Sequence, residues 1–229
     1  MISVVIPTLN AEAGLGRTLD SLSSHRVEEI IVADGGSADG TCALATSRGA
    51  RLVIGAPGRG PQQRAGAAAA RAPYLLFLHA DTALEAGWCE EAAAFIAAPG
   101  AGERAAAFRF ALDDADWRAR VLERAVAARC ALFALPYGDQ GLLISRNFYE
   151  ALGGHEPAPL FEDVALARRI GKARMTMLAS RAVTSADAWR RAGYGRASAR
   201  NLVLLSRYLA GADPAKLAES YRRWERTGA

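Results

Sequence analysis

Four short apolar runs in the first 80 residues constrain the fold of this chain most. They occupy residues 2–6, 29–33, 51–54 and 74–78, and stretches with helical spacing of apolar residues separate them. This alternation predicts parallel strands joined by crossover helices. Helices cover both faces of such a sheet, which explains why the runs are almost continuously apolar. We therefore predict an α/β fold whose ligands bind beyond the carboxyl ends of the strands.

The second half of the chain is less regular, and it shows no internal repeat, low-complexity linker or break in composition. Its patterns predict strands at 104–112, 142–145 and around 175–178, and helices at 116–132, from 162, at 197–210 and at 214–224. We predict one domain over residues 1–195. The amphipathic C-terminal helices, within residues 196–229, are expected to pack on this domain or on a partner.

Composition narrows the class of protein. The 229 residues are 51% hydrophobic, and the three cysteines show no CxxC spacing, which argues against a disulfide framework or a zinc site. The N-terminus runs directly into a strand pattern, unlike a signal peptide, and no apolar run reaches the roughly 20 residues of a membrane span. We predict a cytoplasmic protein. The net charge of +4 favours anionic partners in general, such as nucleotide phosphates, nucleic acid or an anionic bilayer.

Polar residues follow the predicted strands at the edge where a ligand would bind. The chain has no GxxxxGK[ST] loop and no glycine fingerprint after its first strand, which excludes P-loop ATPases and NAD dehydrogenases. Asp34 ends the second strand, where its carboxylate can bind a nucleobase or a ribose hydroxyl, and Gly35 permits a close approach of the backbone. An Asx turn explains Asp34 equally well, and Asp39 can simply cap the next helix.

The fourth strand ends in His79-Ala80-Asp81. Alternation along a strand places His79 and Asp81 on the same side. A single carboxylate such as Asp81 can hold Mg²⁺ or Mn²⁺ when a diphosphate supplies further oxygens. In the alternative interpretation, Asp81 caps a helix that starts near Glu85, and His79 is a core histidine whose nitrogens are hydrogen-bonded. For His79 we favour that alternative.

Two further groups suit an anionic ligand or a proton transfer. Arg59 can place its charge over a diphosphate, with Gln62 in the first turn of the next helix, although most such arginines are simply solvated. Glu162 and Asp163 open a predicted helix, where acids stabilise the first turn whether or not they do chemistry. Adjacent helical positions diverge by about 100°, so one acid can face a cleft and deprotonate a hydroxyl while the other supports it.

Taken together, motifs along the first 195 residues make the chain resemble the family 2 glycosyltransferases of the GT-A fold. The motifs are SVVIPTLNAE, IIVADGGSADGT, GRGPQQRAGAA, LLFLHADT, LPYGDQG, PLFEDVALARRI and TSADAWRRAG. Within the family the chain is most similar to the radical-SAM/selenodomain-associated transferase 2 subgroup. The resemblance implies a Rossmann-like, mostly parallel sheet flanked by helices. It also implies transfer of a sugar from a nucleoside-diphosphate-sugar donor to a hydroxyl acceptor, with inversion and with Mg²⁺ or Mn²⁺.

The resemblance also implies a role for individual residues. The donor nucleotide would be bound by Pro7, Thr8, Asn10, Glu12, Asp34, Gly35, Arg59 and Gln62. The transferred sugar, the acceptor or the pyrophosphate would be approached by Asp139, Gln140, Trp189, Arg190 and Arg191. Asp81 matches the last acid of the family's DxD motif and would hold the metal. Asp163, supported by Glu162, matches the general base of an inverting transferase.

The chain departs from the family pattern at three positions: His79 replaces the first DxD acid, Leu9 replaces an aromatic residue that stacks on the base, and Arg64 replaces a frequent asparagine. Two other functions remain as alternatives. A sugar-1-phosphate nucleotidyltransferase would need a glycine-rich basic loop that is absent after the first strand. A non-catalytic nucleotide- or lipid-binding module would tolerate His79.

The partners follow from the same resemblance. We predict a nucleoside-diphosphate-sugar donor, an unknown acceptor that can be lipid-linked, and no nucleic acid. For the C-terminal amphipathic helices, packing on the domain or in a homodimer is favoured over peripheral contact with the inner face of a membrane.

Overall fold

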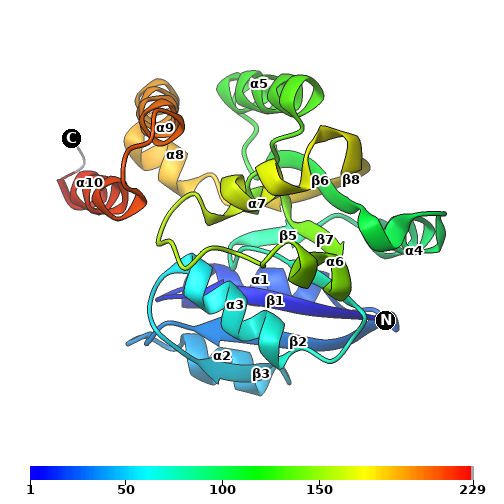
Figure 1. The fold of residues 1–229 in the computed structure, drawn as a ribbon. Helices are drawn as coiled ribbons and strands as arrows, with labels where there is room; N and C mark the ends of the chain where they lie inside the picture. Colours follow the sequence, from blue (N-terminus) through cyan, green and yellow to red (C-terminus); the bar gives the residue numbers. More distant parts are fainter. Residues whose placement is uncertain (228–229) are drawn as a thin grey trace.

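The computed structural model describes residues 1–227 and contains one eight-stranded sheet, in the order β3-β2-β1-β4-β7-β6-β8-β5 (Figure 1). The strands are β1 (Ile2–Thr8), β2 (Val27–Asp34), β3 (Arg51–Ile54), β4 (Tyr74–Phe77), β5 (Thr82–Leu84), β6 (Ala105–Leu112), β7 (Leu142–Ser145) and β8 (Met175–Thr184). The helices are α1 (Glu12–Ser21), α2 (Thr41–Ser47), α3 (Arg59–Ala69), α4 (Trp88–Ala97), α5 (Trp117–Phe133), α6 (Arg146–Ala151), α7 (Glu162–Ile170), α8 (Asp187–Ala192), α9 (Tyr194–Leu209) and α10 (Pro214–Thr227).

The first four strands are parallel, as their apolar runs predicted. β1 pairs with β2 and with β4, and β2 pairs with β3. In this register Thr8 lies opposite Asp34, and Asp34 lies opposite Ile54, so these strands end together at one edge of the sheet. The predicted arrangement of strand ends is therefore confirmed.

Both faces of the sheet are apolar because side chains alternate along each strand. In β1, Val4 and Ile6 belong to a core cluster with α1 and α4, whereas Val5 belongs to a second cluster with α3, α6 and α7. A third cluster forms where α5 packs on the distal half of β6. Helices thus cover the sheet from both sides, and the longer connections lie near the strand ends.

Three elements were not predicted from the sequence pattern, namely β5 in the first half of the chain and α6 and α8 in the second. The strand predicted at 175–178 continues to Thr184 because β8 pairs with β6 on one side and with β5 on the other. Asp81 precedes β5 directly, and α4 begins only at Trp88 after Gly87. The alternative in which Asp81 caps the next helix is therefore wrong.

The C-terminal helices α8, α9 and α10 lie together beyond the strand ends, on the left in Figure 1. Among the described residues, no helix combines the length and apolarity needed to cross a membrane.

Candidate active site

A cavity of about 190 Å³ opens where the segments after β4 and β8 meet the start of α7 and the helices α8, α9 and α10. His79 and Asp81 both line it, as predicted from their alternation. Five residues predicted for the site from the sequence are gathered here: Arg59, Asp81, Asp139, Asp163 and Trp189. The cavity is therefore lined by three carboxylates and two arginines, Arg59 and Arg200, and Trp189 adds an aromatic wall.

Asp163 is held by backbone donors at the start of α7. Its Oδ2 accepts a hydrogen bond of 2.6 Å from the Gly138 amide, and its Oδ1 accepts one of 2.7 Å from the Val164 amide. The helix starts abruptly because Phe161 at its N-cap adopts a left-handed conformation with φ 63°. The Phe161 ring stacks on Tyr208 of α9, with centroids 4.8 Å apart. Packing between α7 and α9 thus helps to fix the direction of the Asp163 carboxylate.

Glu162 lies behind Asp163 and is completely buried. Neither of its carboxylate oxygens has a hydrogen-bond partner among the described residues. Burial, and then the charge of Asp163, raise the pKa of Glu162 to about 8, although Arg59 opposes this shift. A carboxyl group of this kind stays protonated at neutral pH. Asp163, the member of the pair that lines the cavity, is therefore the candidate base.

Asp139 and His79 carry two more unpaired polar atoms at the cavity. Asp139 Oδ1 and His79 Nε2 are buried and lack hydrogen-bond partners among the described residues. Burial raises the pKa of Asp139 to about 6, and it lowers the pKa of His79 to about 3, helped by the charge of Arg59. The expectation that His79 is a core histidine with satisfied nitrogens is therefore wrong for Nε2. Gly138 lies so close to this ring that a Cβ there would lie 2.3 Å from Nε2.

Arg59 lies among these acidic groups. Burial alone would lower its pKa, but the neighbouring ionisable groups, Glu162 first and then Tyr221, Asp163 and Asp81, raise it. Burial in turn raises the pKa of Asp81, and Arg59 lowers it in part. The cavity therefore combines a permanent positive charge with carboxylates that lie close enough to affect one another.

The loops after β1 and β2 form a separate polar cluster outside this cavity. Asp34 is fully buried, and its carboxylate accepts hydrogen bonds from the Thr8 hydroxyl and the Ser37 hydroxyl and from the amides of Gly36 and Ser37. The Asx-turn interpretation of Asp34 is therefore confirmed as a structural fact. Its predicted contact with a base or ribose stays a prediction.

The two loops are also tied directly to each other. Asn10 has φ 52°, and its side-chain oxygen accepts a hydrogen bond of 2.8 Å from the Ala38 amide. Glu12 accepts one of 2.9 Å from the Gly40 amide, and the Glu12 amide donates to Asp39. Pro7 and Thr8, the last two residues of β1, are buried. These residues hold the loops in a fixed shape.

Gln62 connects the ends of β1 and β2 through hydrogen bonds to their backbone. Its buried side-chain amide donates to the carbonyl oxygens of Thr8 and Ala33. Gly35 permits this approach, because a Cβ there would lie 3.0 Å from the Gln62 nitrogen and from the Pro57 Cα. The Gln62 amide group thus binds the backbone of β1 and β2.

Gln140, predicted near the sugar or the acceptor, points away from the cavity. Its buried amide nitrogen donates to the Phe108 carbonyl at 3.0 Å, and its oxygen accepts from Arg129 at 3.1 Å and from the Tyr137 amide at 3.3 Å. The side chain therefore anchors the short helical turn that carries Asp139.

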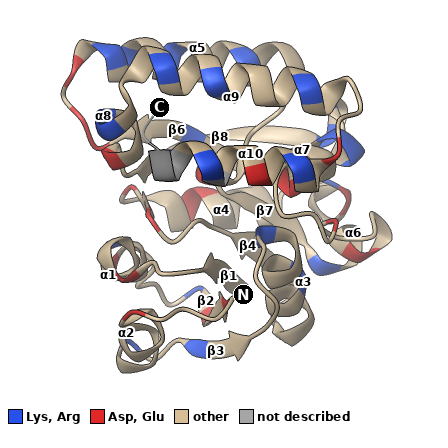
Figure 2. Ribbon diagram, turned by 90° about the vertical axis from the view of Figure 1, so that its left-hand side faces the viewer, with Lys and Arg blue, Asp and Glu red and all other residues tan. Residues whose placement is uncertain are grey.

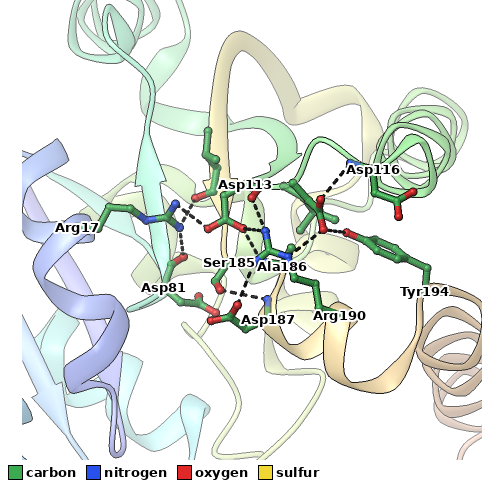
Figure 3. A network of polar contacts seen from close by, with 12 residues as sticks. Arg17, Asp81, Asp113, Asp116, Ser185, Ala186, Asp187, Arg190 and Tyr194 are labelled. Atoms are coloured by element: carbon green, nitrogen blue, oxygen red, sulfur yellow. Dashed lines mark hydrogen bonds and ion pairs between the residues drawn. The ribbon is translucent and has the colours of Figure 1, made fainter.

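Arg190 lies in a network at the ends of β6 and β8 (Figure 3). It forms ion pairs with Asp113, Asp114 and Asp187, and Arg17 from α1 pairs with Asp113 at 3.0 Å. Arg17 also donates to the Asp81 carbonyl at 3.0 Å. The guanidinium of Arg190 thus lies among protein acids and outside the cavity lining, and the network fixes the backbone at Asp81.

Trp189 and Arg191, its neighbours on α8, differ in environment. Trp189 lines the cavity and stacks on Tyr194, with centroids 6.1 Å apart. Arg191 is exposed and is absent from the cavity lining. Of Trp189, Arg190 and Arg191, which were predicted together, only Trp189 thus lines the cavity.

Arg200 was not predicted from the sequence, yet it lines the cavity from α9 together with Asn201 and Leu204. Its guanidinium lies 4.4 Å from the centroid of the Tyr221 ring and 3.8 Å from that of Trp224, both on α10. A signal was present in the sequence, because Arg200 shares a helical face with Ala197 and Leu204, both of which are buried. An arginine on the apolar face of an amphipathic helix indicates a specific partner.

A family model decides how this site is classified. The model described as glycosyl transferase family 2 matches residues 3–139 of the chain. The chain belongs to glycosyl transferase family 2. The match spans the strands and loops that lead to Asp34, Asp81 and Asp139, and the membership predicted from the motifs is confirmed.

Individual relatives support this family 2 assignment. Over 92 residues, the chain is 36% identical to glucosyl-3-phosphoglycerate synthase from Mycolicibacterium paratuberculosis, an alignment that covers 35% of this chain and 28% of that protein. The structure is similar to that of glucosyl-3-phosphoglycerate synthase from Mycobacterium tuberculosis with Mn²⁺, UDP and phosphoglyceric acid. That match has a TM-score of 0.56 and 25% identity, and it covers 77% of this chain and 67% of the other.

A second solved structure shares the fold at lower identity. S. aureus TarS 1-349 in complex with UDP-GlcNAc gives a TM-score of 0.62 at 15% identity, with 80% of this chain and 58% of the TarS chain covered. The predicted GT-A fold of this family 2 glycosyl transferase is therefore confirmed.

Proposed function

We propose that this chain transfers a sugar from a nucleoside-diphosphate-sugar donor to a hydroxyl acceptor, with inversion at the anomeric carbon. The observation that carries the proposal is the Asp163 carboxylate at the cavity, held by the Gly138 and Val164 amides and accompanied by Asp81, Asp139 and Arg59. Family 2 membership supports the reaction class.

In the proposed reaction, Asp163 accepts the proton of the acceptor hydroxyl as its oxygen attacks the anomeric carbon. The bond from that carbon to the donor phosphate oxygen breaks, and the nucleoside diphosphate leaves with the bonding electrons. Arg59 can offset the negative charge that accumulates on the leaving diphosphate. A single displacement inverts the configuration and needs no covalent sugar intermediate on the protein.

A divalent cation fits the cavity residues. Among the described residues, Asp139 Oδ1 is buried without a hydrogen-bond partner, and the Asp81 carboxylate accepts a long hydrogen bond of 3.4 Å from the Thr82 hydroxyl. Among residues 1–227, no three His, Cys, Asp or Glu side chains form a complete metal site. Asp81 would therefore hold Mg²⁺ or Mn²⁺ together with diphosphate oxygens, as hard ions with few protein ligands do. When bound, the ion would offset charge on the diphosphate.

The donor nucleotide is proposed to lie along the loops after β1 and β2, with Pro7, Thr8, Asn10, Glu12 and Asp34 forming or shaping the nucleoside site. The related synthase structure contains UDP, and the TarS structure contains UDP-GlcNAc, which makes a uridine donor the first to test. The acceptor in the synthase structure is phosphoglyceric acid. The radical-SAM-associated subgroup, a lipid-linked acceptor and a homodimer stay predictions from the sequence.

A thermal-shift screen tests the donor directly. UDP-, GDP- and TDP-sugars would be compared with and without Mn²⁺, and we expect one base to raise the melting temperature only with the metal. Product analysis then tests the reaction. Release of nucleoside diphosphate supports sugar transfer, whereas release of pyrophosphate would identify a nucleotidyltransferase, and binding without turnover of any donor would identify a non-catalytic module.

A further inference from the structure

The large exposed apolar side chains are concentrated on two helices. In the described part of the chain, ten large apolar residues are exposed, and seven of these lie on α5 or α9. The seven are Trp117, Val121, Leu132 and Phe133 on α5, and Leu202, Val203 and Leu209 on α9. Single exposed apolar residues are ordinary on a protein surface, but a concentration of this kind indicates a contact surface.

On α5 the exposed residues form a stripe on the face away from the sheet. Trp117, Val121 and Leu132 repeat at helical spacing, and Trp117 is 68% exposed. The opposite face, with Ala119 and Val126, is buried against β6. The packing of α5 on its own domain is therefore already complete without the stripe.

α9 shows the same division. Leu204 is buried and lines the cavity, whereas Leu202 and Val203 are 67% and 54% exposed. Both views place α5 and α9 at the same end of the molecule, farthest from β3 (Figures 1 and 2). We call the exposed residues Trp117, Val121, Leu132, Leu202 and Val203 the α5–α9 face.

The charge of the two helices that form this face is mainly positive. α5 contains four arginines and one acid, Glu123, which is paired with Arg120 at 2.9 Å, and α9 contains three arginines and no acid. Arg124, Arg196 and Arg207 are exposed, and none of them forms an ion pair with a carboxylate whose side chain the structure describes. Figure 2 shows the resulting basic segments on the helices at the top of the view.

This charge distinguishes between two occupants of the face. In a two-fold dimer the same patch meets itself, so each unpaired arginine would approach an equally basic surface. An anionic bilayer instead supplies opposite charge to the arginines and an apolar layer to the tryptophan and the aliphatic side chains. We propose that the α5–α9 face binds the surface of a membrane that contains anionic phospholipid.

The contact would place the cavity close to the lipid surface. α9 presents Leu202 to one side and Asn201 and Leu204 to the cavity on the other. A helix with its side chains is roughly 10 Å across, so only this distance separates the two. The proposal rests on residues outside the cavity, and it stands or falls independently of sugar transfer.

Co-sedimentation with vesicles tests the proposal. We expect the full chain to bind vesicles of 70% phosphatidylcholine and 30% phosphatidylglycerol, to bind pure phosphatidylcholine at least tenfold more weakly, and to dissociate in 0.5 M NaCl. Trp117→Ser with Leu202→Ser should weaken binding by roughly tenfold or more for each side chain. Arg124→Gln with Arg207→Gln should weaken it by about fivefold for each arginine.

Matched variants at the other end of the molecule serve as controls. Ile54 on β3 is 63% exposed, and Ile54→Ser should leave binding unchanged. Arg26→Gln with Arg48→Gln lowers the net charge by two units, as Arg124→Gln with Arg207→Gln does. This control pair should leave binding nearly unchanged. All substituted side chains are exposed, and circular dichroism would verify the fold of each variant.

A spectroscopic measurement reports on Trp117 itself. Brominated phosphatidylcholine in the mixed vesicles should quench part of the fluorescence of the wild-type protein, and this part should disappear in Trp117→Phe. Equal binding to the two vesicle types, or binding to neither, would overturn the proposal. So would a dimer in solution that dissociates when Trp117 and Leu202 are changed, because it would assign the face to a second copy.

Discussion

Two polar clusters at the strand ends differ in how their hydrogen bonds are satisfied. In the loops after β1 and β2, Asp34, Asn10 and Glu12 bond to the protein's own amides and hydroxyls. At the cavity, Asp139 in the lining and Glu162 behind Asp163 keep buried oxygens without partners among the described residues. A buried polar atom that lacks a partner costs free energy, so a folded protein retains it mainly where a ligand or a reaction uses it.

This difference indicates that the loop cluster maintains the shape of a binding surface, whereas the cavity cluster carries the reactive groups. The loop cluster is rigid before any ligand arrives, and it can offer a nucleotide a preformed surface at small entropic cost. The cavity cluster holds acids whose pKa values are shifted by burial and by each other, as reactive sites commonly do. Substitutions in the first cluster should therefore mainly affect stability. Substitutions in the second should affect binding or turnover and, at Glu162, the dependence of stability on pH.

The largest effect is expected for Asp163→Asn. Asparagine preserves the shape but cannot take the acceptor proton, so kcat should fall by about 10³ while the Kd for nucleotide stays within about twofold. Nucleoside diphosphate release and calorimetry measure the two quantities. Asp20→Asn, on the surface of α1, is the control. Full transfer by the Asp163 variant would eliminate this residue as the base.

Glu162→Gln should change the dependence of stability on pH. The pKa of Glu162 rises from 4.5 to about 8 on folding, so the unfolded chain releases this proton first. The free energy of unfolding of the wild type should thus fall as pH rises from about 4.5 to 8, and the glutamine variant should lack this decrease. We expect the two to differ by on the order of 3 kcal/mol at pH 8.5.

Urea titrations at pH 5, 6.5 and 8.5 would measure the effect of Glu162→Gln. The exposed Glu28→Gln variant serves as the control and should follow the wild type at all three values. Identical pH profiles for the wild type and Glu162→Gln would show that Glu162 ionises like an ordinary surface carboxyl group, contrary to its burial.

Asp81→Asn should weaken metal-dependent nucleotide binding. The amide cannot supply the negative charge that a hard divalent ion requires, so the affinity for UDP with Mn²⁺ should fall by roughly 100-fold. With EDTA present, the variant and the wild type should bind equally weakly. Unchanged calorimetric affinity in Mn²⁺ would remove Asp81 from the metal site, while a loss that persists in EDTA would point to the nucleotide itself.

Asp34→Ala tests the rigid cluster. It leaves the Thr8 and Ser37 hydroxyls and the Gly36 and Ser37 amides without their acceptor, which should lower the free energy of unfolding by about 2 kcal/mol. For a domain of this size the melting temperature should fall by about 4–8 °C. Exposed Asp20→Ala should have little effect. A stable variant that loses nucleotide binding would instead show that Asp34 acts on the ligand.

Much of the fold could be predicted because the strand signal is local. Apolar runs fix β1 to β4, and parallel pairing then brings the residues after each strand to one edge. β5 and α8 could not be predicted this way. β5 has only three residues and depends on its pairing with β8, while α8 spans only six residues.

The site was predictable in part for the same reason. Asp81 and Asp163 follow from motifs at a strand end and at a helix start, and both line the cavity. Sequence motifs do not tell which way a side chain points, so Gln62 and Gln140 were placed on the ligand although both bond to the backbone. Arg200 was missed because its role depends on how α9 and α10 fold back over the cavity.

The smallest effect is expected for Arg190, to which the family resemblance and the geometry assign different roles. A residue that binds pyrophosphate should change the Kd for nucleotide when it is lost. Arg190 instead pairs with Asp113, Asp114 and Asp187, and it is 45% exposed, so solvent screens these pairs. We expect Arg190→Gln to lower the melting temperature slightly and to leave the affinity for nucleotide unchanged. Arg191→Gln, one position along α8, is the matched control and should change neither quantity. A loss of nucleotide affinity in Arg190→Gln alone, at unchanged melting temperature, would mean that the guanidinium leaves its acids to bind the ligand.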